Sequence, residues 1–234
     1  MKMLLTAFLV GCLSVSSLKA QGFKNAQAFS EWLMAYQENP EPAKLYPAFA
    51  FGVSNKELAR AGGRKLLMAF FGSVFRADSS LIPAFYERGT QSTAENRQYG
   101  FVGALWIANT ATSRRYLDAY LHSGKAKKVK GSESLTTPPF NIYRDSITQP
   151  EHLDLIWADF FATGNPGNIQ RIASVLSEGG PLAAAAKWSL TSNGIRYPKP
   201  RRLIQSEANE HPRPDIRNQL VLIVADMASE LKKQ

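Results

Sequence analysis

Apolar residues recur with a helical period along most of this chain, and the pattern is clearest between Thr148 and Gly179. Thr148 and Glu151 have the spacing of a capping box, which predicts the start of a helix. Glycine adopts a left-handed backbone at low cost, so Gly164 is expected to end that helix. Between these points one broad apolar face recurs at i, i+3, i+4, i+7 and i+8. Its members are Leu153, Ile156, Trp157, Phe160 and Phe161.

A second helix is predicted immediately afterwards. Asn165 and Pro166 have the order of an N-cap followed by proline at the first helical position. Apolar residues then continue at helical spacing until the glycines and proline at 179–181, which end this helix and open another. The two helices form a predicted hairpin with a tight turn. The apolar face of the second helix comprises Ile169, Ile172, Ala173 and Leu176.

The same period predicts helices over nearly the whole chain, and no stretch shows the alternation of a strand. The predicted fold class is therefore all-α. Pro42 and Pro47 are expected to divide 44–53 into short helical pieces, and four prolines between 198 and 214 are expected to frame an irregular segment. Further helices are expected from about 25 to 38, after the glycines at 62–63, at 81–86, from a capping box of Ser92 and Glu95 through 106, from a cap at 112–113 through 121, and at 182–190, 202–208 and 215–231.

Four large aromatic residues suggest an internal repeat. Phe70, Trp106, Trp157 and Trp188 each fall toward the end of the first helix of a predicted hairpin. Their spacing approaches the period of helical-hairpin arrays once a loop insertion at about 124–147 is set aside. We therefore expect stacked hairpins, in the manner of a short α-solenoid, with these tryptophans in structural positions. An irregular helical bundle is the alternative.

The start of the chain predicts export. Residues 1–3 form a short basic region, and Leu4 to Leu18 is mostly apolar with small residues toward its end. This pattern is typical of a secretory signal peptide at 1–20, cleaved near Ala20 to leave a single helical domain at 21–234. Such short signals are common in Gram-negative export, so we expect a periplasmic or secreted protein. The alternative is a lipoprotein, because residues 9–12 fit a lipobox ending in Cys12.

Two strings in the last third of the chain support the same expectation. Ile156 to Pro166 (IWADFFATGNP) and Ala186 to Asn193 (AKWSLTSN) resemble motifs of uncharacterised exported all-helical proteins of proteobacteria. The resemblance implies an all-helical fold and an exported location. It implies no activity, because the matched residues form turns and core.

The chain is basic, with 28 Lys and Arg against 19 Asp and Glu and a formal net charge of +9. A basic surface favours anionic partners, which in the periplasm are phospholipid headgroups, lipopolysaccharide, peptidoglycan carboxylates or an acidic protein; nucleic acid is not expected there. Two clusters are candidate binding residues, although a solvated loop explains the lysines equally well. The clusters are Lys125, Lys127, Lys128 and Lys130, and Arg196, Arg201 and Arg202.

Signals for catalysis or metal binding are weak. Cys12 is the only cysteine and lies in the signal, so a disulfide scaffold, a zinc–cysteine site and a cysteine nucleophile are excluded for the mature chain. The three histidines are isolated in sequence, and no phosphate loop, nucleotide fingerprint or nucleophile elbow occurs. No catalytic residue, metal ligand or cofactor is predicted. Asp159, an acid between Trp157 and Phe160, is expected to pair with Arg171.

These features predict an exported, non-enzymatic helical protein that binds a protein or an anionic envelope component. An inhibitor or immunity-type protein is one specific form of this hypothesis. Two alternatives remain open: an envelope hydrolase whose carboxylates assemble from distant helices, and an acylated outer-membrane scaffold. Membrane contact is expected only as peripheral binding, or through a lipid at Cys12. The oligomeric state is not predicted.

Overall fold

The computed structural model describes residues 22–56, 58, 61–91, 95–123, 135 and 137–233. Within these ranges there are eleven α-helices and one 3₁₀ turn and no strand, which confirms the predicted all-α fold. The predicted signal at 1–20 with Cys12, the residue Ser92 of a predicted capping box, and the cluster of Lys125, Lys127, Lys128 and Lys130 lie outside the described residues. The elements are α1 (Ala26–Ala35), α2 (Pro42–Ser54), α3 (Ala61–Ala77), η1 (Ser79–Leu81), α4 (Ile82–Gln91), α5 (Glu95–Ala108), α6 (Ala111–His122), α7 (Pro150–Thr163), α8 (Gly167–Ala173), α9 (Gly180–Arg196), α10 (Pro198–Glu210) and α11 (Pro214–Leu231).

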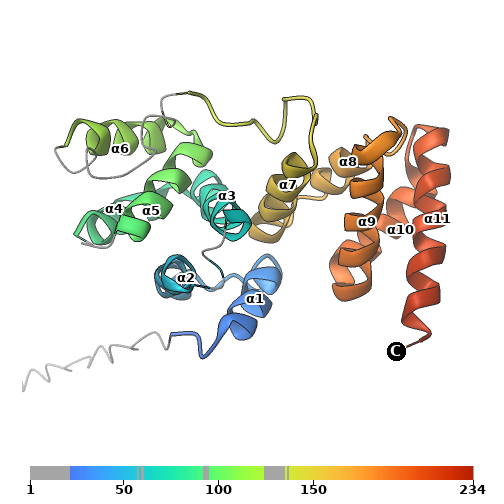
Figure 1. The fold of residues 1–234 in the computed structure, drawn as a ribbon, viewed down its shortest axis with the longest axis horizontal. Coiled ribbons are helices and arrows are strands. Elements are labelled where there is room, and N and C mark those ends of the chain that lie inside the picture. Colours follow the sequence, from blue (N-terminus) through green and yellow to red (C-terminus); the bar gives the residue numbers. More distant parts are fainter. Residues whose placement is uncertain are drawn as a thin grey trace, which may run out of the picture.

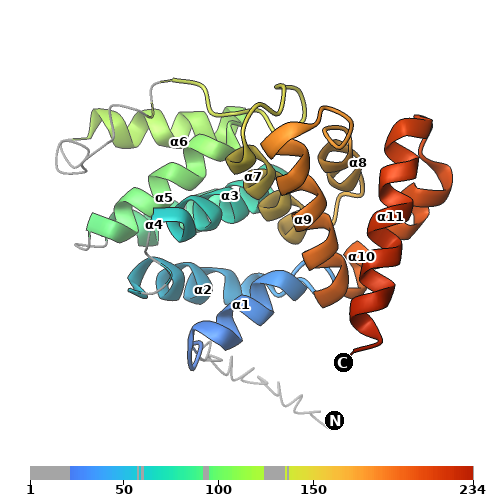
Figure 2. The ribbon, with the colours of Figure 1, turned by 45° about the vertical axis from the view of Figure 1, so that its right-hand side comes forward.

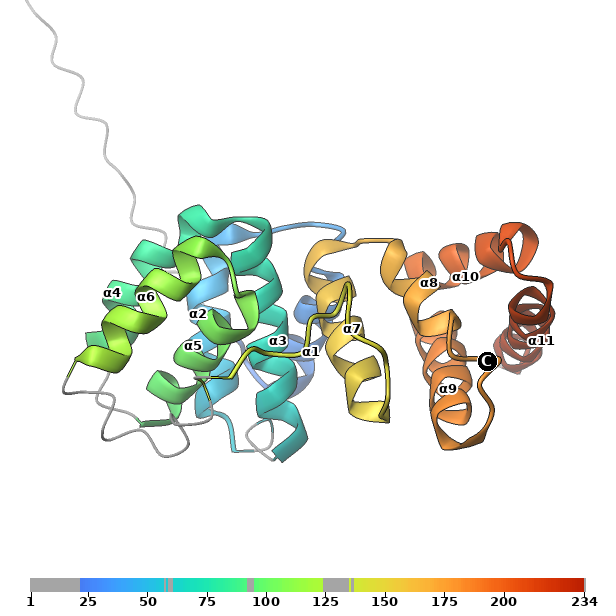
Figure 3. The same ribbon diagram turned by 90° about the horizontal axis from the view of Figure 1, so that it is seen from above.

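Helix α3 lies in the middle of an elongated molecule (Figure 1), with α4, α5 and α6 at one end and α9, α10 and α11 at the other. It packs against α5 on one side and α7 on the other, and these are the most extensive helix contacts in the fold. The views in Figures 2 and 3 show the same order of helices from end to end. Because the main contacts of α3 join helices that are not sequence neighbours, a regular stack of hairpins is not confirmed.

The core is a continuous aromatic cluster around α3. Phe71 is fully buried, and its ring centroid lies 5.3 Å from those of Phe49 on α2 and Phe70. Phe75 packs 5.0 Å from Phe85 on α4. Most of these rings meet edge to face, the arrangement that aromatic quadrupoles favour. The predicted apolar face of α7 is confirmed, because all five of its members are buried.

Glycine at position 72 permits the close approach of α3 and α5. A Cβ atom there would lie 2.8 Å from Cγ2 of Ile107 and 2.9 Å from the carbonyl oxygen of Ala104. We expect Gly72→Ala to lower the free energy of unfolding by about 1–3 kcal/mol, because a backbone oxygen cannot move aside without separating the helices. Gly103→Ala is the matched comparison, since its Cβ would meet only the flexible side chain of Met68. Urea denaturation of both variants tests this, and an equal loss in the two would contradict it.

The start of α7 differs from the prediction. The helix begins at Pro150, and its N-cap Gln149 makes no side-chain capping bond, so the capping box of Thr148 and Glu151 does not form. Proline at the first helical position needs no N–H partner and fixes φ for the helix, which explains the later start. The backbone N–H of Thr148 instead donates to Nδ1 of His152 over 3.3 Å.

The end of α7 is as predicted. Gly164 is left-handed with φ 69°, and its N–H donates to the carbonyl oxygen of Phe160 over 2.7 Å. Helix α8 then begins at Gly167 with Pro166 as its N-cap, one residue later than predicted, although Oδ1 of Asn165 accepts from the N–H of Gly167. At this turn the ammonium of Lys199 on α10 donates to Oε1 of Gln37, which follows α1.

Three further predictions from prolines and caps were wrong. Helix α2 continues through Pro47 because burial of its apolar residues offsets the lost backbone bond. Helix α10 runs from Pro198 to Glu210, longer than 202–208, because its prolines fall in the first turn, where no N–H bond is required. Helix α6 is capped by Thr110, which forms a reciprocal capping box with Ser113.

The three tryptophans predicted to be structural differ in burial. Trp157 is buried, and Trp106 is partly buried with Nε1 donating to the carbonyl oxygen of Thr137. Trp188 is 72% exposed, so its predicted role in the core was wrong. The face of α9 that packs inward carries Ala186, Leu190 and Gly194 instead, and Trp188 falls on the opposite face.

Candidate functional site

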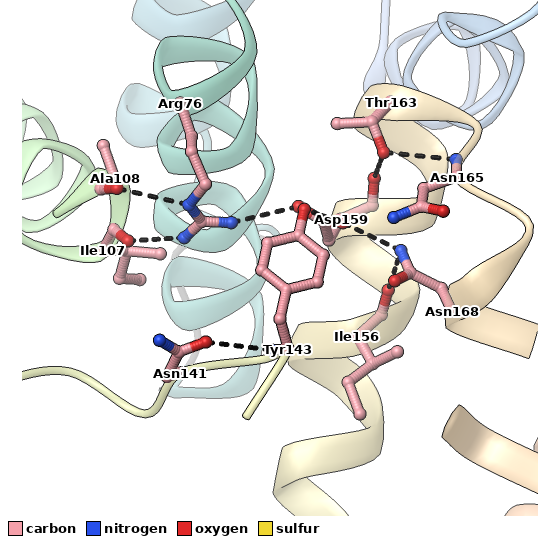
Figure 4. A network of polar contacts seen from close by, with 10 residues as sticks. All are labelled: Arg76, Ile107, Ala108, Asn141, Tyr143, Ile156, Asp159, Thr163, Asn165 and Asn168. Carbon is pink, nitrogen blue, oxygen red and sulfur yellow. Dashed lines mark hydrogen bonds and ion pairs between the residues drawn. The ribbon is translucent and has the colours of Figure 1, made fainter. Parts of the chain in front are cut away.

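A buried carboxylate joins four parts of the chain. Asp159 on α7 is 0% exposed, and both of its oxygens accept hydrogen bonds (Figure 4). Oδ1 accepts from Nη1 of Arg76 on α3 over 3.2 Å, and Oδ2 accepts from the hydroxyl of Tyr143 over 3.0 Å and from Nδ2 of Asn168 on α8 over 2.8 Å. A buried charge is tolerated only when it is paired and hydrogen-bonded in this way.

The predicted partner of Asp159 was wrong. Arg171 donates to the carbonyl oxygens of Asp145 over 2.6 Å and Tyr143 over 3.5 Å. It therefore holds the segment before α7 through backbone groups, while Arg76 neutralises the carboxylate. Both arginines thus fix the 137–147 segment, part of the predicted insertion, against the helical body.

Arg76 also binds the end of α5. Its Nε donates to the carbonyl oxygen of Ala108 over 3.2 Å and its Nη2 to that of Ile107 over 2.6 Å. The guanidinium lies 5.5 Å from the centre of the Tyr143 ring. A guanidinium has five N–H donors, and these contacts with Asp159, Ile107 and Ala108 use three of them. These contacts hold the guanidinium in one position where α3, α5 and α7 meet.

A pocket of about 370 Å³ opens beside Arg76. Its wall comes from the junction of α5 and α6 and from the segment that Arg171 holds. Two arginines line it and no aspartate or glutamate does, so the described lining carries net positive charge. The lining residues are Arg76, Ile107, Ala108, Asn109, Thr110, Pro139, Phe140, Asn141, Tyr143 and Arg144.

Arg144 is the adaptable part of this lining. Arg144 is exposed, and its guanidinium forms no hydrogen bond or ion pair with the described part of the chain. Thr110, the N-cap of α6, lies in the same wall, and its capping box with Ser113 fixes that part of the lining. Arg76 is held rigidly, Arg144 is free to move, and Pro139 and Phe140 add an apolar edge. This combination suits an anionic group with an apolar neighbour.

Tyr143 donates to Asp159 rather than acting as a base. Burial and the nearby Asp159 carboxylate raise the pKa of Tyr143, and the Arg76 guanidinium opposes this only in part. The phenol therefore stays protonated at neutral pH and remains a hydrogen-bond donor. Both oxygens of Asp159 already accept bonds, so this carboxylate neutralises Arg76 and orients the Tyr143 hydroxyl.

His152 supports the pocket wall from behind. Its ring stacks on Phe140 with centroids 3.9 Å apart, and its Nδ1 accepts from the backbone of Thr148. Burial lowers the pKa of His152 below its ordinary value of 6.5, although Glu151 and Asp145 oppose this. The folded chain therefore favours the neutral ring.

The lowered pKa of His152 predicts that the stability of the fold depends on pH. The unfolded chain binds the proton of His152 more readily than the folded chain, so this stabilisation is present above pH 6.5 and is lost as the pH falls through the lower folded pKa. We expect His152→Phe, which keeps a ring beside Phe140, to reduce the loss of stability between neutral and mildly acidic pH. Chemical denaturation across this range measures the effect, and NMR titration of the ring gives the pKa directly. A pKa above 6.5 would contradict the prediction.

The other histidines lie apart from this site. Nδ1 of His122 lies 2.8 Å from the carbonyl oxygen of Asp118, at the end of α6. His211 is buried, and its Nδ1 accepts from the backbone N–H of Arg213. No group of three or more His, Cys, Asp or Glu residues that could hold a metal ion occurs among the described residues.

The predicted arginine cluster does not line the pocket. Arg201 was predicted as a binding residue, but its Nε and Nη2 donate to the carbonyl oxygens of Gly194 and Ile195 over 2.8 and 2.5 Å. It therefore caps the end of α9, where cations are favoured. Arg196 and Arg202 are exposed on α9 and α10. The structure brings none of these three residues to the site around Arg76.

No family model, curated protein or solved structure matches this chain. The resemblance to exported proteobacterial proteins therefore stays a prediction. In the described part of the chain no single helix is long and apolar enough to cross a membrane; one pair, Gly63–Ala77 with Ser79–Gln91, meets that criterion of length and composition only when taken together, bent by 107°.

Proposed function

We propose that this chain is an exported, non-catalytic binding protein whose pocket beside Arg76 receives an anionic group of its ligand. The observation that carries the proposal is that both Arg76 and Arg144 line this pocket, whereas no aspartate or glutamate does. The predicted signal peptide supports export. The ligand belongs to the class predicted from charge, an anionic envelope component or an acidic protein.

The geometry favours a carboxylate or a phosphate. Two guanidinium groups can approach such a group from different sides, and a planar guanidinium matches its oxygens in a bidentate manner. The pocket volume lies in the range that holds small ligands or the end of a larger one. Ile107, Pro139 and Phe140 provide apolar surface beside the charge, which indicates a ligand that is not a bare ion.

The fixed position of Arg76 strengthens the proposal. Asp159 and two carbonyl oxygens hold its guanidinium before any ligand arrives, so binding costs little side-chain entropy there. Asp159 neutralises one positive charge, which leaves Arg144 as the main source of net charge. Arg144 is therefore the residue whose removal separates binding from folding.

We expect Arg144→Gln to weaken binding of inorganic phosphate, used as a probe, by about tenfold, since a charged hydrogen bond contributes about 1.5–3 kcal/mol. NMR titration of mature protein, residues 21–234, with phosphate measures the affinity and reports the side-chain signals of both pocket arginines. Arg202→Gln is the matched control, because it removes the same charge from an exposed helix away from the pocket. Equal weakening in the two variants would show only general attraction, and the pocket would not be the site.

A further inference from the structure

A second surface, independent of the pocket, is apolar and exposed at the C-terminal end of the molecule. Trp188 on α9 is 72% exposed, and Val221 and Leu222 on α11 are 50% and 53% exposed. Ala225 and Ala228 extend this exposed strip along α11. We call Trp188, Val221, Leu222 and Ala225 the α9/α11 patch.

Helix α11 has two apolar faces, and only one is used in the fold. Its inner face is buried against α9 and α10 and comprises Ile216, Leu220, Ile223 and Met227. The outer side carries Val221, Leu222 and Ala225 of the patch, together with polar residues that include Asp226. Amphipathic surface helices normally present polar residues there, so an apolar outer face on the last helix indicates a partner.

An ion pair connects the two helices of the patch. Nζ of Lys187 lies 3.1 Å from Oδ2 of Asp226, and both side chains are about half exposed. Trp188 follows Lys187 directly, and Leu222 precedes Asp226 by one turn on the same side of α11. Trp188 and Leu222 therefore flank this ion pair at the surface. The two helices pack side by side at the end of the fold (Figure 2).

The C-terminal helices, two of which carry the patch, have an excess of cations. Residues 180–233 contain nine Lys and Arg and five Asp and Glu. Three of those acids are already paired: Asp226 with Lys187, Glu230 with Lys233 and Asp215 with Arg213. The exposed cations that remain near the ends of α9, α10 and α11 are Arg196, Arg202 and Lys232. Exposed apolar residues on helices with a net positive charge complement a surface that is apolar and anionic.

The charge and the apolar character of the patch favour a membrane over a second copy of the chain as its partner. A second copy of the chain would bring two positively charged helical segments together, which like-charge repulsion disfavours. A membrane that contains anionic lipid offers both of the required chemistries and adapts to the convex side of a helix. Tryptophan is the side chain that favours the boundary between headgroups and hydrocarbon.

We propose that the α9/α11 patch binds the surface of a bilayer that contains anionic lipid. Trp188, Val221 and Leu222 enter the headgroup region, and exposed cations of the same helices, such as Arg196 and Lys232, contact the lipid phosphates. This interaction is peripheral. It leaves the pocket beside Arg76 free, because that pocket is formed by α3, the α5–α6 junction and the 137–147 segment.

Vesicle sedimentation of mature protein, residues 21–234, tests the proposal. We expect binding to vesicles of phosphatidylcholine with phosphatidylglycerol, a blue shift of tryptophan fluorescence, and weaker binding as salt screens the charges. Trp188→Ala and the double variant Val221→Ser, Leu222→Ser should each lower the partition coefficient at least about tenfold. Leu66→Ser is the matched control, because Leu66 is 40% exposed on α3 and should leave binding unchanged.

Three results would overturn the proposal: no binding to the anionic vesicles, equal binding by the patch variants, or a dimer in light scattering that Trp188→Ala dissociates. Circular dichroism of each variant shows whether the fold is retained. Phosphate titration separates this surface from the pocket, since Trp188→Ala should bind the probe like the unmodified chain and Arg144→Gln should still bind vesicles.

Discussion

Replacement of Asp159 by alanine is expected to lower the free energy of unfolding by about 3–5 kcal/mol, because it leaves the guanidinium of Arg76 partly buried without its counter-ion. The side chain of Arg76 is only 22% exposed, so water can compensate in part at most. In the same variant the hydroxyl of Tyr143 loses its acceptor, and the amide of Asn168 keeps only the longer bond to the carbonyl oxygen of Ile156. Urea denaturation followed by circular dichroism measures the loss.

The double variant Arg76→Met, Asp159→Leu is the informative control. Removing both members of a buried ion pair costs less than removing one, since no unpaired charge remains. We expect the double variant to be more stable than the sum of the two single losses predicts. If the losses of Arg76→Met and Asp159→Leu simply add, the two side chains do not interact as a pair in solution.

Phe71→Ala is expected to lower the free energy of unfolding by about 3–5 kcal/mol, because it opens a cavity at the centre of the aromatic cluster. Phe71 is fully buried on the helix that contacts both α5 and α7, and its neighbours Phe49 and Phe70 are themselves enclosed. Rigid neighbours cannot collapse into the space. The loss is therefore expected at the upper part of the range for large-to-small substitutions.

Thermal and urea unfolding of Phe71→Ala beside Leu66→Ala give the comparison. Leu66 belongs to the same helix but is 40% exposed, so its truncation should change the free energy of unfolding by about 0.5 kcal/mol or less. A third variant, Phe71→Leu, retains most of the volume and should lie between them. Comparable losses at positions 66 and 71 would show that α3 is not packed at the centre of the fold.

Periodicity predicted the elements of this fold better than their ends. The apolar face of α7 and its stop at Gly164 follow from the spacing of a few local residues, and both are confirmed. The extents of α2 and α10 depended on proline, whose effect changes with its position in the helix. A structural role was expected for Trp188 because it occupies the same place in the suspected hairpin repeat as Phe70, Trp106 and Trp157.

The candidate site could not be found from the sequence. Arg76 and Asp159 are 83 positions apart, and nothing in the local pattern of either residue identifies the other. Arg171 was preferred because it lies on the facing helix of the predicted hairpin, yet its guanidinium reaches backbone carbonyl groups. Phe140 and Arg144 both lie in the loop insertion predicted at about 124–147, and Phe140 packs against the helical body. No sequence signal identified Arg144.

The contact between Gln37 and Lys199 has a consequence for how the chain is made. These residues are 162 positions apart, and α1 also packs against α7. Helix α1 therefore cannot complete its packing until most of the polypeptide has left the ribosome. A nascent chain with this connectivity stays open for longer than one built from local contacts. Such a delay would suit a protein that must cross a membrane as an extended chain and fold on the far side.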